Sequence, residues 1–404
     1  MKTIYFDIEN TLHSNYIAGI QRVTREFAKI VTSKNGLSLK HHYEPIIYDS
    51  NSKNWRKITK SEHDRLWLSA PTQSKLFNRI KNHLIKRLPK AKSLYIEPLD
   101  QDSIFLDIES AWHSKLKRKN LFPELKRGEV EIVKLHYDLV PILFPELTHP
   151  HTRIAFNEHL DAHLRYANLF LCISKVSESD LRNYCTKHLI TKPKTSIIQL
   201  GVGSNYLHAP VRKSSSLEKF GKYIVCVGTL EPRKNHILLI DAFNEIKDRS
   251  HLNLVLIGRT GWLSDKLIES IETHEDFNKR IFHIHNASDD EVIAFYDNAW
   301  LNVVASHYEG YGLSVIEALT RGCPTICSNT GSLPEAGEKY VRYFSPNLSE
   351  SLTSLLLELS ESAPAYTELQ RLTASFRPPS WQQTVKQIDS AISTELSNHQ
   401  KQQL

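Results

Sequence analysis

Two glutamates could carry chemistry in the stretch SHYEGYGLSVIEALTRGCP. Glu309 precedes a turn that contains Gly310 and Gly312, and Glu317 falls in the apolar run that follows. Paired carboxylates suit acid–base catalysis or the binding of sugar hydroxyls. The glycines permit a tight turn and a close approach of the backbone to a ligand. Taken alone, the pair also fits an ordinary turn residue and an exposed helix carboxylate, so both interpretations are open.

A second motif places Arg233 and Lys234 at the start of an expected helix, in VGTLEPRKNHILLIDAF, where the chain turns through Gly228. Free N–H groups at a helix start favour a phosphate, and adjacent Arg and Lys side chains add charge-assisted hydrogen bonds. A solvated basic turn explains the same residues equally well.

The first half of the chain holds further candidates. Gly19 stands just before a helical pattern, where a glycine lets the backbone approach a ligand. His136 and Asp138 follow an apolar run, at the strand end where α/β proteins keep functional groups. Their alternative role is to order a proline-rich loop. No G-x-G-x-x-G follows any expected strand, which disfavours a nicotinamide or flavin enzyme.

The elements that must position these residues follow the rhythm of parallel α/β units. One series of apolar runs includes TIYFDI, SIFLDI, EIVKLHYDLV and LFLCIS, and a second includes YIVCVGTL, NLVLIGRTG, RIFHIH and LNVVAS. A polar, basic stretch between them predicts a linker. We expect domains at 1–205 and 206–378, with a ligand cleft between them, and a final segment, 379–404, whose helix packs back on the first domain.

Composition narrows the class of protein only slightly. The net charge of +6 suits an anionic small molecule or membrane surface but decides neither. No apolar run is long enough to span a membrane, and the N-terminus lacks an apolar signal core. Residues 75–90 form a basic amphipathic pattern, which fits either an anionic membrane surface or a surface helix packed on its own domain.

Two other polar motifs are assigned to structure. Ser332 with Glu335, and Ser288 with Glu291, have the spacing of capping boxes. The acidic run HNASDDEV therefore suits a helix start, and we expect no metal site there.

Together the motifs resemble one family. VGTLEPRKN, LIGRTGW, ASHYEGYGLSVIEALTRGCPTICSN and GSLPEAG occur in the order and spacing of retaining glycosyltransferases of family four, which have the GT-B fold. AGIQRV and YDLVPILFPE resemble the mannosyltransferase-like group 1 glycosyltransferases of bacterial surface polysaccharide synthesis. The resemblance implies two Rossmann-like domains with the nucleotide-sugar held mainly by the second.

The resemblance also implies roles for residues. Arg233 and Lys234 neutralise the donor diphosphate, Glu309 contacts the donor sugar near its reacting centre, and Glu317 binds the ribose hydroxyls. Because the family often has histidine directly before aspartate where this chain has HYDL, either His136 or Tyr137 takes the place near the sugar. The remaining expected donor-binding residues are Gly19, Gly228, Gly310, Tyr311, Gly312, Leu313, Ile284 and Asp138.

The predicted function is the retaining, metal-independent transfer of a mannose-like hexose, from a donor expected to be GDP-linked, to a growing lipid-linked surface glycan. No cofactor or nucleic-acid partner is expected. The predicted location is the cytoplasm, with peripheral binding to the inner face of the cytoplasmic membrane as an alternative. Two other functions are open: a UDP-sugar-dependent transferase with a soluble acceptor, and a sugar-nucleotide-binding protein without transferase activity.

Overall fold

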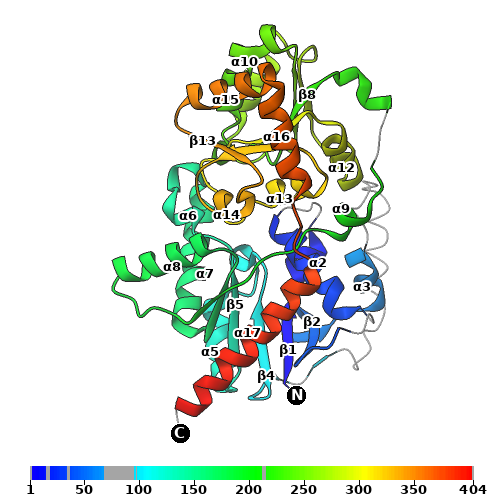
Figure 1. The fold of residues 1–404 in the computed structure, drawn as a ribbon. Helices are drawn as coiled ribbons and strands as arrows, with labels where there is room; N and C mark the ends of the chain where they lie inside the picture. Colours follow the sequence, from blue (N-terminus) through cyan, green and yellow to red (C-terminus); the bar gives the residue numbers. More distant parts are fainter. Residues whose placement is uncertain are drawn as a thin grey trace.

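The computed structural model describes residues 2–14, 19–33, 37–67, 95–96, 98–211 and 215–402, with side chains to 397. The basic segment 75–90 lies outside these residues. The described chain forms two α/β domains, one above the other in Figure 1. Each is built on its own sheet, as the alternating apolar and amphipathic runs predict.

The first domain surrounds a seven-stranded sheet of order β3-β2-β1-β4-β5-β6-β7. All neighbouring strands are parallel except β2 and β3. The strands are β1 (Thr3–Asp7), β2 (His42–Asp49), β3 (Asn54–Lys57), β4 (Ser103–Asp107), β5 (Glu131–His136), β6 (Leu169–Cys172) and β7 (Thr195–Ile197). The helices are α1 (Glu9–His13), α2 (Gly19–Thr32), α3 (Lys60–Trp67), α5 (Arg118–Arg127), α6 (Val140–Leu143), α7 (Pro150–Tyr166) and α8 (Lys175–Lys187), with short 3-10 turns η2 (Ala111–His113) and η3 (Pro145–Leu147).

The second domain contains a fully parallel six-stranded sheet of order β10-β9-β8-β11-β12-β13. Its strands are β8 (Tyr223–Val227), β9 (Asn253–Ile257), β10 (Ile281–Ile284), β11 (Leu301–Val304), β12 (Thr325–Ser328) and β13 (Arg342–Phe344). Its helices are α9 (Ser204–His208), α10 (His236–Ser250), α11 (Asp265–Glu272), α12 (Asp289–Asn298), α13 (Leu313–Thr320), α14 (Leu333–Gly337), α15 (Ser349–Glu361) and α16 (Ala363–Ala374), with 3-10 turns η4 (Ser215–Phe220) and η5 (Pro232–Lys234).

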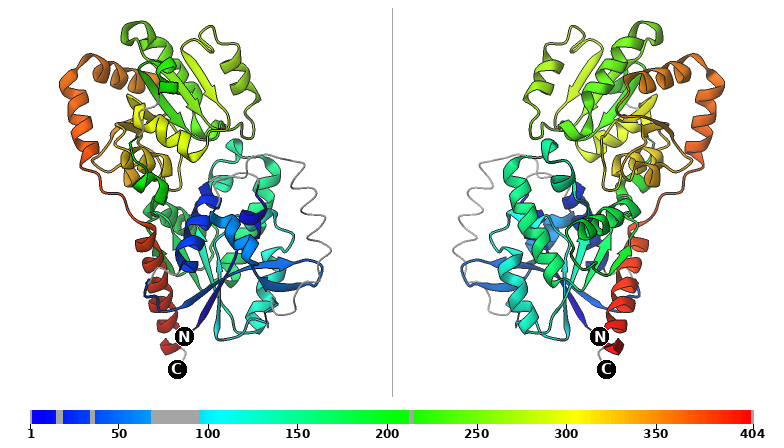
Figure 2. Two further views of the ribbon diagram at one scale, coloured as in Figure 1. Left: turned by 90° about the vertical axis from the view of Figure 1, so that its right-hand side faces the viewer. Right: turned by 90° about the vertical axis from the view of Figure 1, so that its left-hand side faces the viewer.

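The last helix, α17 (Trp381–Gln402), returns to the first domain and lies along it in Figure 2. Its apolar stripe, from Trp381 through Val385 and Ile388 to Ile392, joins the core formed by strands β1 and β4. The expected return of the C-terminal helix is confirmed. The crossing is tight, because a Cβ atom added to Gly201 would lie 2.4 Å from the backbone nitrogen of Trp381.

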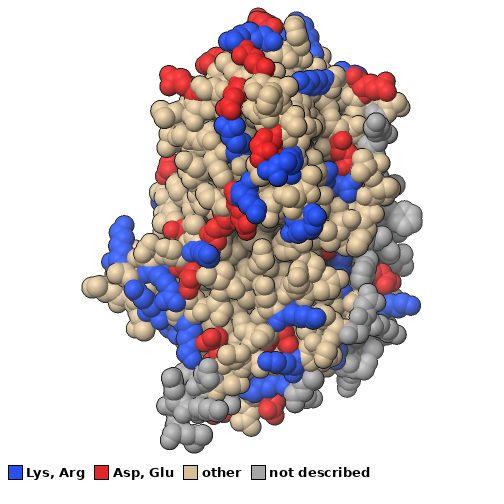
Figure 3. All heavy atoms as spheres, viewed as in Figure 1, with Lys and Arg blue, Asp and Glu red and all other residues tan. Residues whose placement is uncertain are grey.

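Charged side chains of both signs are interspersed over the face drawn in Figure 3. Among the helices that the structure describes, none combines the length and the apolarity needed to cross a membrane. The bounds 1–205, 206–378 and 379–404 stay predictions, although the strands of the two sheets come from either side of the expected linker.

Candidate active site at the domain interface

Glu309 accepts hydrogen bonds from three side chains of the second domain. Arg233 Nη1 donates to Glu309 Oε2 at 2.8 Å, while Lys234 Nζ and Ser306 Oγ donate to Oε1, each at 2.6 Å. Glu309 lies in the loop between β11 and α13, and the two cations lie in η5, after β8. Because β8 and β11 are neighbouring parallel strands, their carboxyl ends bring these two loops together.

The electrostatics of this group fix the charge of Glu309. The residue is only 8% exposed, and burial acts to raise the pKa of its carboxyl. Arg233 and Lys234 outweigh that effect and hold the pKa at about 2. Glu309 is therefore ionised at every physiological pH.

Arg233 is fixed by contacts on all sides of its guanidinium group. Its Nε and Nη2 donate to Glu231 Oε1 at 3.1 and 2.7 Å, and its Nη1 also donates to the carbonyl of Tyr308 at 2.7 Å. Lys234 has room because residue 228 is glycine, where an added Cβ would lie 3.4 Å from the Lys234 Cε atom. Glu231 stands two residues before Arg233, so the sequence contained a signal for this partner that our prediction did not use.

The glycine turn after Glu309 lies against the first domain. A Cβ atom on Gly310 would come within 2.9 Å of both Tyr137 O and Asp138 Oδ2. The hydroxyl of Tyr311 donates to Leu200 O at 2.6 Å. Gly312 adopts a φ of +97° as the N-cap of α13, a conformation that favours glycine, and Leu313 is the first residue of that helix.

Glu317 is buried on α13, at 3% exposure, and contacts the first domain directly. Arg22 Nη1, from α2, donates to Glu317 Oε1, and Arg22 Nη2 donates to Asp289 Oδ1 at 2.9 Å. Burial raises the pKa of Glu317, and the neighbouring Arg22 acts to lower it. The interpretation of Glu317 as an exposed helix carboxylate is wrong.

Of the candidates His136 and Asp138, Asp138 lies at the interface and His136 does not. Asp138 faces Gly310, and burial raises the pKa of its carboxyl. His136 is 3% exposed at the end of β5, and its ring packs edge-on against Phe170, with centroids 6.1 Å apart. Burial lowers its pKa to about 3. The structure thus places the His136 ring in the core of the first domain and away from the interface, and the choice between His136 and Tyr137 as the residue near the sugar stays a prediction.

Two donor-binding candidates stand apart from this group. Gly19 is exposed at the first position of α2, and an added Cβ would meet nothing within 4 Å. Ile284 ends the edge strand β10, and its carbonyl accepts from Gly258 N at 3.0 Å. Our prediction did not include Gly258. Glycine is required there, because a Cβ atom would lie 1.9 Å from Gly228 O.

The predicted capping box of Ser332 and Glu335 is wrong. Ser332 Oγ instead donates to the carbonyl of Glu309 at 2.9 Å. The Glu335 carboxylate crosses to the first domain, where it accepts from the backbone N–H groups of Lys175 and Val176 at 2.8 and 2.9 Å. A carboxylate is favourable at the N-terminus of α8, so tertiary contact has replaced the local cap. The capping box at Ser288 is confirmed.

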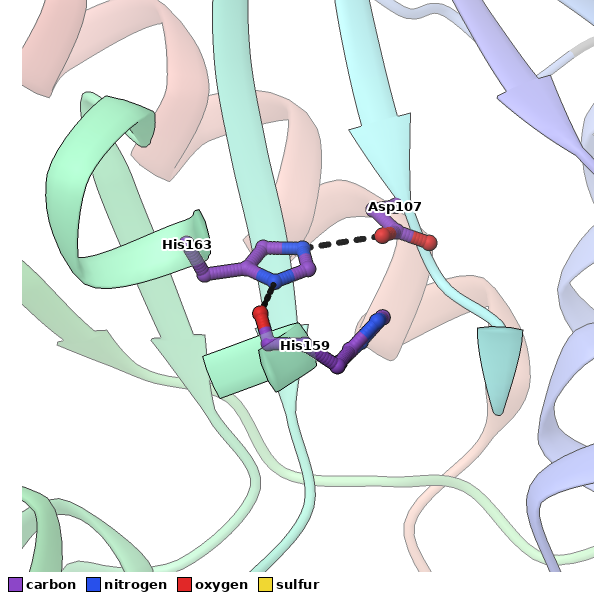
Figure 4. A group of neighbouring side chains, drawn as sticks. All are labelled: Asp107, His159 and His163. Atoms are coloured by element: carbon purple, nitrogen blue, oxygen red, sulfur yellow. Dashed lines mark hydrogen bonds and ion pairs between the residues drawn. The ribbon is translucent and has the colours of Figure 1, made fainter. Parts of the chain in front are cut away.

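One group of side chains in the described first domain has the composition of a metal site: Asp107, His159 and His163. Figure 4 shows His163 between Asp107 and the backbone carbonyl of His159; the His163 Nε2 to Asp107 Oδ2 distance is 2.8 Å. Arg118 also donates to both oxygens of Asp107, and Lys134 Nζ lies 3.3 Å from His159 Nε2. Asp107 and His159 thus already contact cationic side chains, and His163 is already hydrogen-bonded to Asp107.

Comparison with known proteins agrees with this geometry. Residues 210–374, which include Arg233, Lys234, Glu309 and Glu317, match the family model described as "Glycosyl transferases group 1". The second domain is thus similar to the group 1 glycosyltransferases. The likeness to group 1 glycosyltransferases inferred from the motifs is thereby confirmed.

This chain has two mannosyltransferases from Escherichia coli among its curated relatives. It is 26% identical to serotype-specific mannosyltransferase WbdA over 222 residues, which cover 52% of this chain and 27% of WbdA. It is 30% identical to O-antigen chain mannosyltransferase B over 239 residues, covering 56% of this chain and 60% of that protein. The chain thus spans less than a third of one relative and about three fifths of the other.

Solved structures extend the likeness to nearly the whole chain. Anabaena HepE, solved in complex with UDP and glucose, has a TM-score of 0.63 at 14% identity, covering 98% of this chain and 100% of HepE. Sucrose-phosphate synthase from Thermosynechococcus elongatus also has a TM-score of 0.63, at 16% identity, covering 100% of this chain and 98% of that enzyme. At these identities the likeness shows the fold alone, and the predicted GT-B fold is confirmed.

Proposed function

We propose that the protein transfers a mannose-like hexose from a GDP-sugar to a growing lipid-linked surface glycan, with retention and without a metal ion. The observation that carries the proposal is Glu309, ionised beside Arg233 and Lys234 in the domain that matches the glycosyltransferase family. The two Escherichia coli relatives are both mannosyltransferases, which supports mannose as the sugar.

The charges at the interface suit the departure of a nucleoside diphosphate. A lysine ammonium has three donor hydrogens, so Lys234 can hold Glu309 and a diphosphate oxygen together. Arg233, fixed by Glu231 and Glu309, adds a second preoriented positive charge. Preorganised cations stabilise the negative charge that develops on the leaving group.

Glu309 and Glu317 do not form an acid–base pair in this proposal. A carboxyl group with a pKa of about 2 holds no proton at neutral pH, so Glu309 cannot protonate a leaving group. An ionised Glu309 instead stabilises positive charge on the reacting sugar. Glu317, on the helix α13 that follows the Glu309 loop, accepts hydrogen bonds from the ribose hydroxyls.

The donor is tested by thermal unfolding with a panel of GDP- and UDP-sugars, because a bound donor stabilises the native state by mass action. We expect GDP-mannose to raise the melting temperature most. A preference for UDP-sugars would move the assignment to a UDP-dependent transferase. No shift with any sugar nucleotide would contradict the proposal.

The site is tested by nucleotide release in the presence of acceptor. Lys234→Ala and Glu309→Ala should each lower the transfer rate on the order of 10²–10³-fold, as when one preorganised electrostatic group is removed from an active site. Arg342→Ala is the control, since Arg342 pairs with Glu358 on the exposed face of the same domain. Equal rates for all variants and the wild type would show that the cluster is not the reaction site.

A further inference from the structure

We infer that Arg22 is a positioning residue that supplies, from the first domain, the charge that keeps Glu317 ionised for the donor nucleoside. The inference rests on the proposed function and deepens it. It makes nucleoside binding a property of both domains, although the residues expected to hold the nucleotide come mainly from the second.

Arg22 makes two hydrogen bonds to the second domain, which is the domain expected to hold the donor. Its Nη1 donates to Glu317 Oε1 on α13, and its Nη2 donates to Asp289 Oδ1, at the first residue of α12. Its guanidinium carbon also lies 5.8 Å from the ring centroid of Tyr206. Two bonds from one planar guanidinium to two helices fix both the distance and the angle between the elements that they join.

The exposures show which partner depends on Arg22 most. The side chain of Asp289 is 30% exposed, whereas that of Glu317 is 4% exposed. Water therefore solvates Asp289 without help, but a buried carboxylate must be paired with a cation or become protonated. A carboxylate has about four lone-pair sites, so a Glu317 bound by Arg22 still has acceptors for two ribose hydroxyls.

Charged and titratable groups face Glu317 from three elements. Arg22 lies on α2, Asp289 and Tyr296 on α12, and Tyr206 on α9. Burial and Asp289 act to raise the pKa of Glu317, whereas Arg22 and, to a smaller extent, Tyr206 act to lower it. If Arg22 loses its charge, the influences that raise the pKa remain, and Glu317 becomes protonated at a higher pH. A protonated carboxyl is a poorer acceptor for hydroxyl groups.

Helix α2 places this arginine one turn after Gly19, which is expected to approach the diphosphate. The same helix would therefore bring a close backbone approach and a charged contact to two parts of one donor. Arg25, further along α2, serves only the first domain among the contacts described, with bonds to the carbonyls of Arg65 and Thr11.

The test is the dissociation constant for GDP, measured by calorimetry from pH 6 to pH 9, with UDP in parallel. The ratio of each variant to the wild type at each pH removes the titration of the diphosphate itself. For Arg22→Gln, we expect GDP binding to be on the order of tenfold weaker at pH 6 and to recover toward pH 9, as Glu317 ionises. Arg22→Lys should restore most of the affinity at pH 6.

Two further variants separate charge from structure. Glu317→Gln in the Arg22→Gln background should remove the pH dependence of the ratio, because no carboxyl remains to titrate. Lys29→Ala removes one positive charge from α2 at a residue paired with Glu26, and its ratio should stay near one at every pH.

The outcomes distinguish this inference from the function on which it rests. If the ratio of the GDP dissociation constants of Arg22→Gln and the wild type is the same at pH 6 and pH 9, the inference is overturned. Arg22 would then serve only to connect the two domains. Failure of Arg22→Lys to restore binding at pH 6 would overturn it as well. A wild type that binds neither GDP nor UDP would overturn the proposed function, and the inference with it.

Discussion

Each domain contains a cluster of charged side chains, and the two clusters differ in how accessible their side chains are. The first-domain cluster comprises Asp7, Asp107, Arg118, Lys134, His159 and His163. The interface cluster comprises Glu231, Arg233, Lys234 and Glu309.

Side-chain exposure separates the two clusters. The side chains of Arg118 and Asp107 are both 0% exposed. Those of Arg233, Lys234 and Glu309 are 16%, 17% and 10% exposed, and the cluster borders the other domain. A sealed network can contribute only to folding, whereas a partly exposed network can exchange one of its partners for a ligand. A buried group of histidines and carboxylates is therefore weaker evidence for function than an ion pair with accessible donors.

The largest effect is expected from a substitution that breaks the first-domain cluster, which is the sealed cluster of the two. Arg118 lies 2.8 Å from the carboxylate of Asp7 and 2.8 Å from that of Asp107. Arg118→Met therefore leaves both buried carboxylates without the cation that they share. Removing one partner from a buried ion pair typically costs about 3–5 kcal/mol, and we expect that loss in the unfolding free energy of the first domain. Denaturant unfolding followed by tryptophan fluorescence measures it.

The neighbouring residue provides the control. Lys119 forms an exposed pair with Glu158 at 3.3 Å, so Lys119→Met should cost about 1 kcal/mol or less. Lys234→Met, in the interface cluster, should cost less stability than Arg118→Met, because Arg233 remains on Glu309. Equal losses for Arg118→Met and Lys234→Met would remove the distinction between the two clusters.

A smaller effect concerns pH and the first domain. Burial, with Lys134 and His163 nearby, lowers the pKa of His136 to about 3, against about 6.5 in an unfolded chain. Below pH 6.5 the unfolded chain therefore binds a proton that the folded chain does not, and stability falls as the pH falls. At pH 5 the contribution is about 2 kcal/mol.

His136→Phe tests this contribution, because phenylalanine keeps an aromatic ring against Phe170 without a titrating group. The variant should lose less stability than the wild type between pH 7 and pH 5, by about 2 kcal/mol. Identical losses in the two proteins would mean that His136 is not held neutral by its surroundings.

The sequence predicted the local parts of this molecule better than its long-range contacts. All eight of the apolar runs quoted above correspond to strands, because both faces of a parallel sheet are covered and the runs are continuous. Strand β2 was not predicted, since Pro45 interrupts its pattern and its register depends on pairing with β1.

The candidate site shows the same division. Arg233, Lys234 and Glu309 could be identified because each follows a strand with glycines nearby. Arg22 was not among the predicted site residues, and its partner on α13 lies 295 positions further along the chain. Glu335 satisfied a local capping pattern and still joined α8 of the other domain. Contacts between domains depend on the packing of both, which no local pattern contains.

The smallest expected effect is that of metal ions on stability. It tests whether side chains of the types that bind metals do so when they are already paired with other groups. Asp107, His159 and His163 offer the ligand types that Zn²⁺ prefers. A bound ion would have to displace Lys134 from His159 and the His163 proton from Asp107, and it would add two positive charges beside Arg118. We therefore expect neither Zn²⁺ nor EDTA to change the melting temperature. A stabilisation that saturates at one Zn²⁺ per chain, and that His159→Ala abolishes, would show that the sealed cluster is a metal site and that accessibility does not distinguish the two.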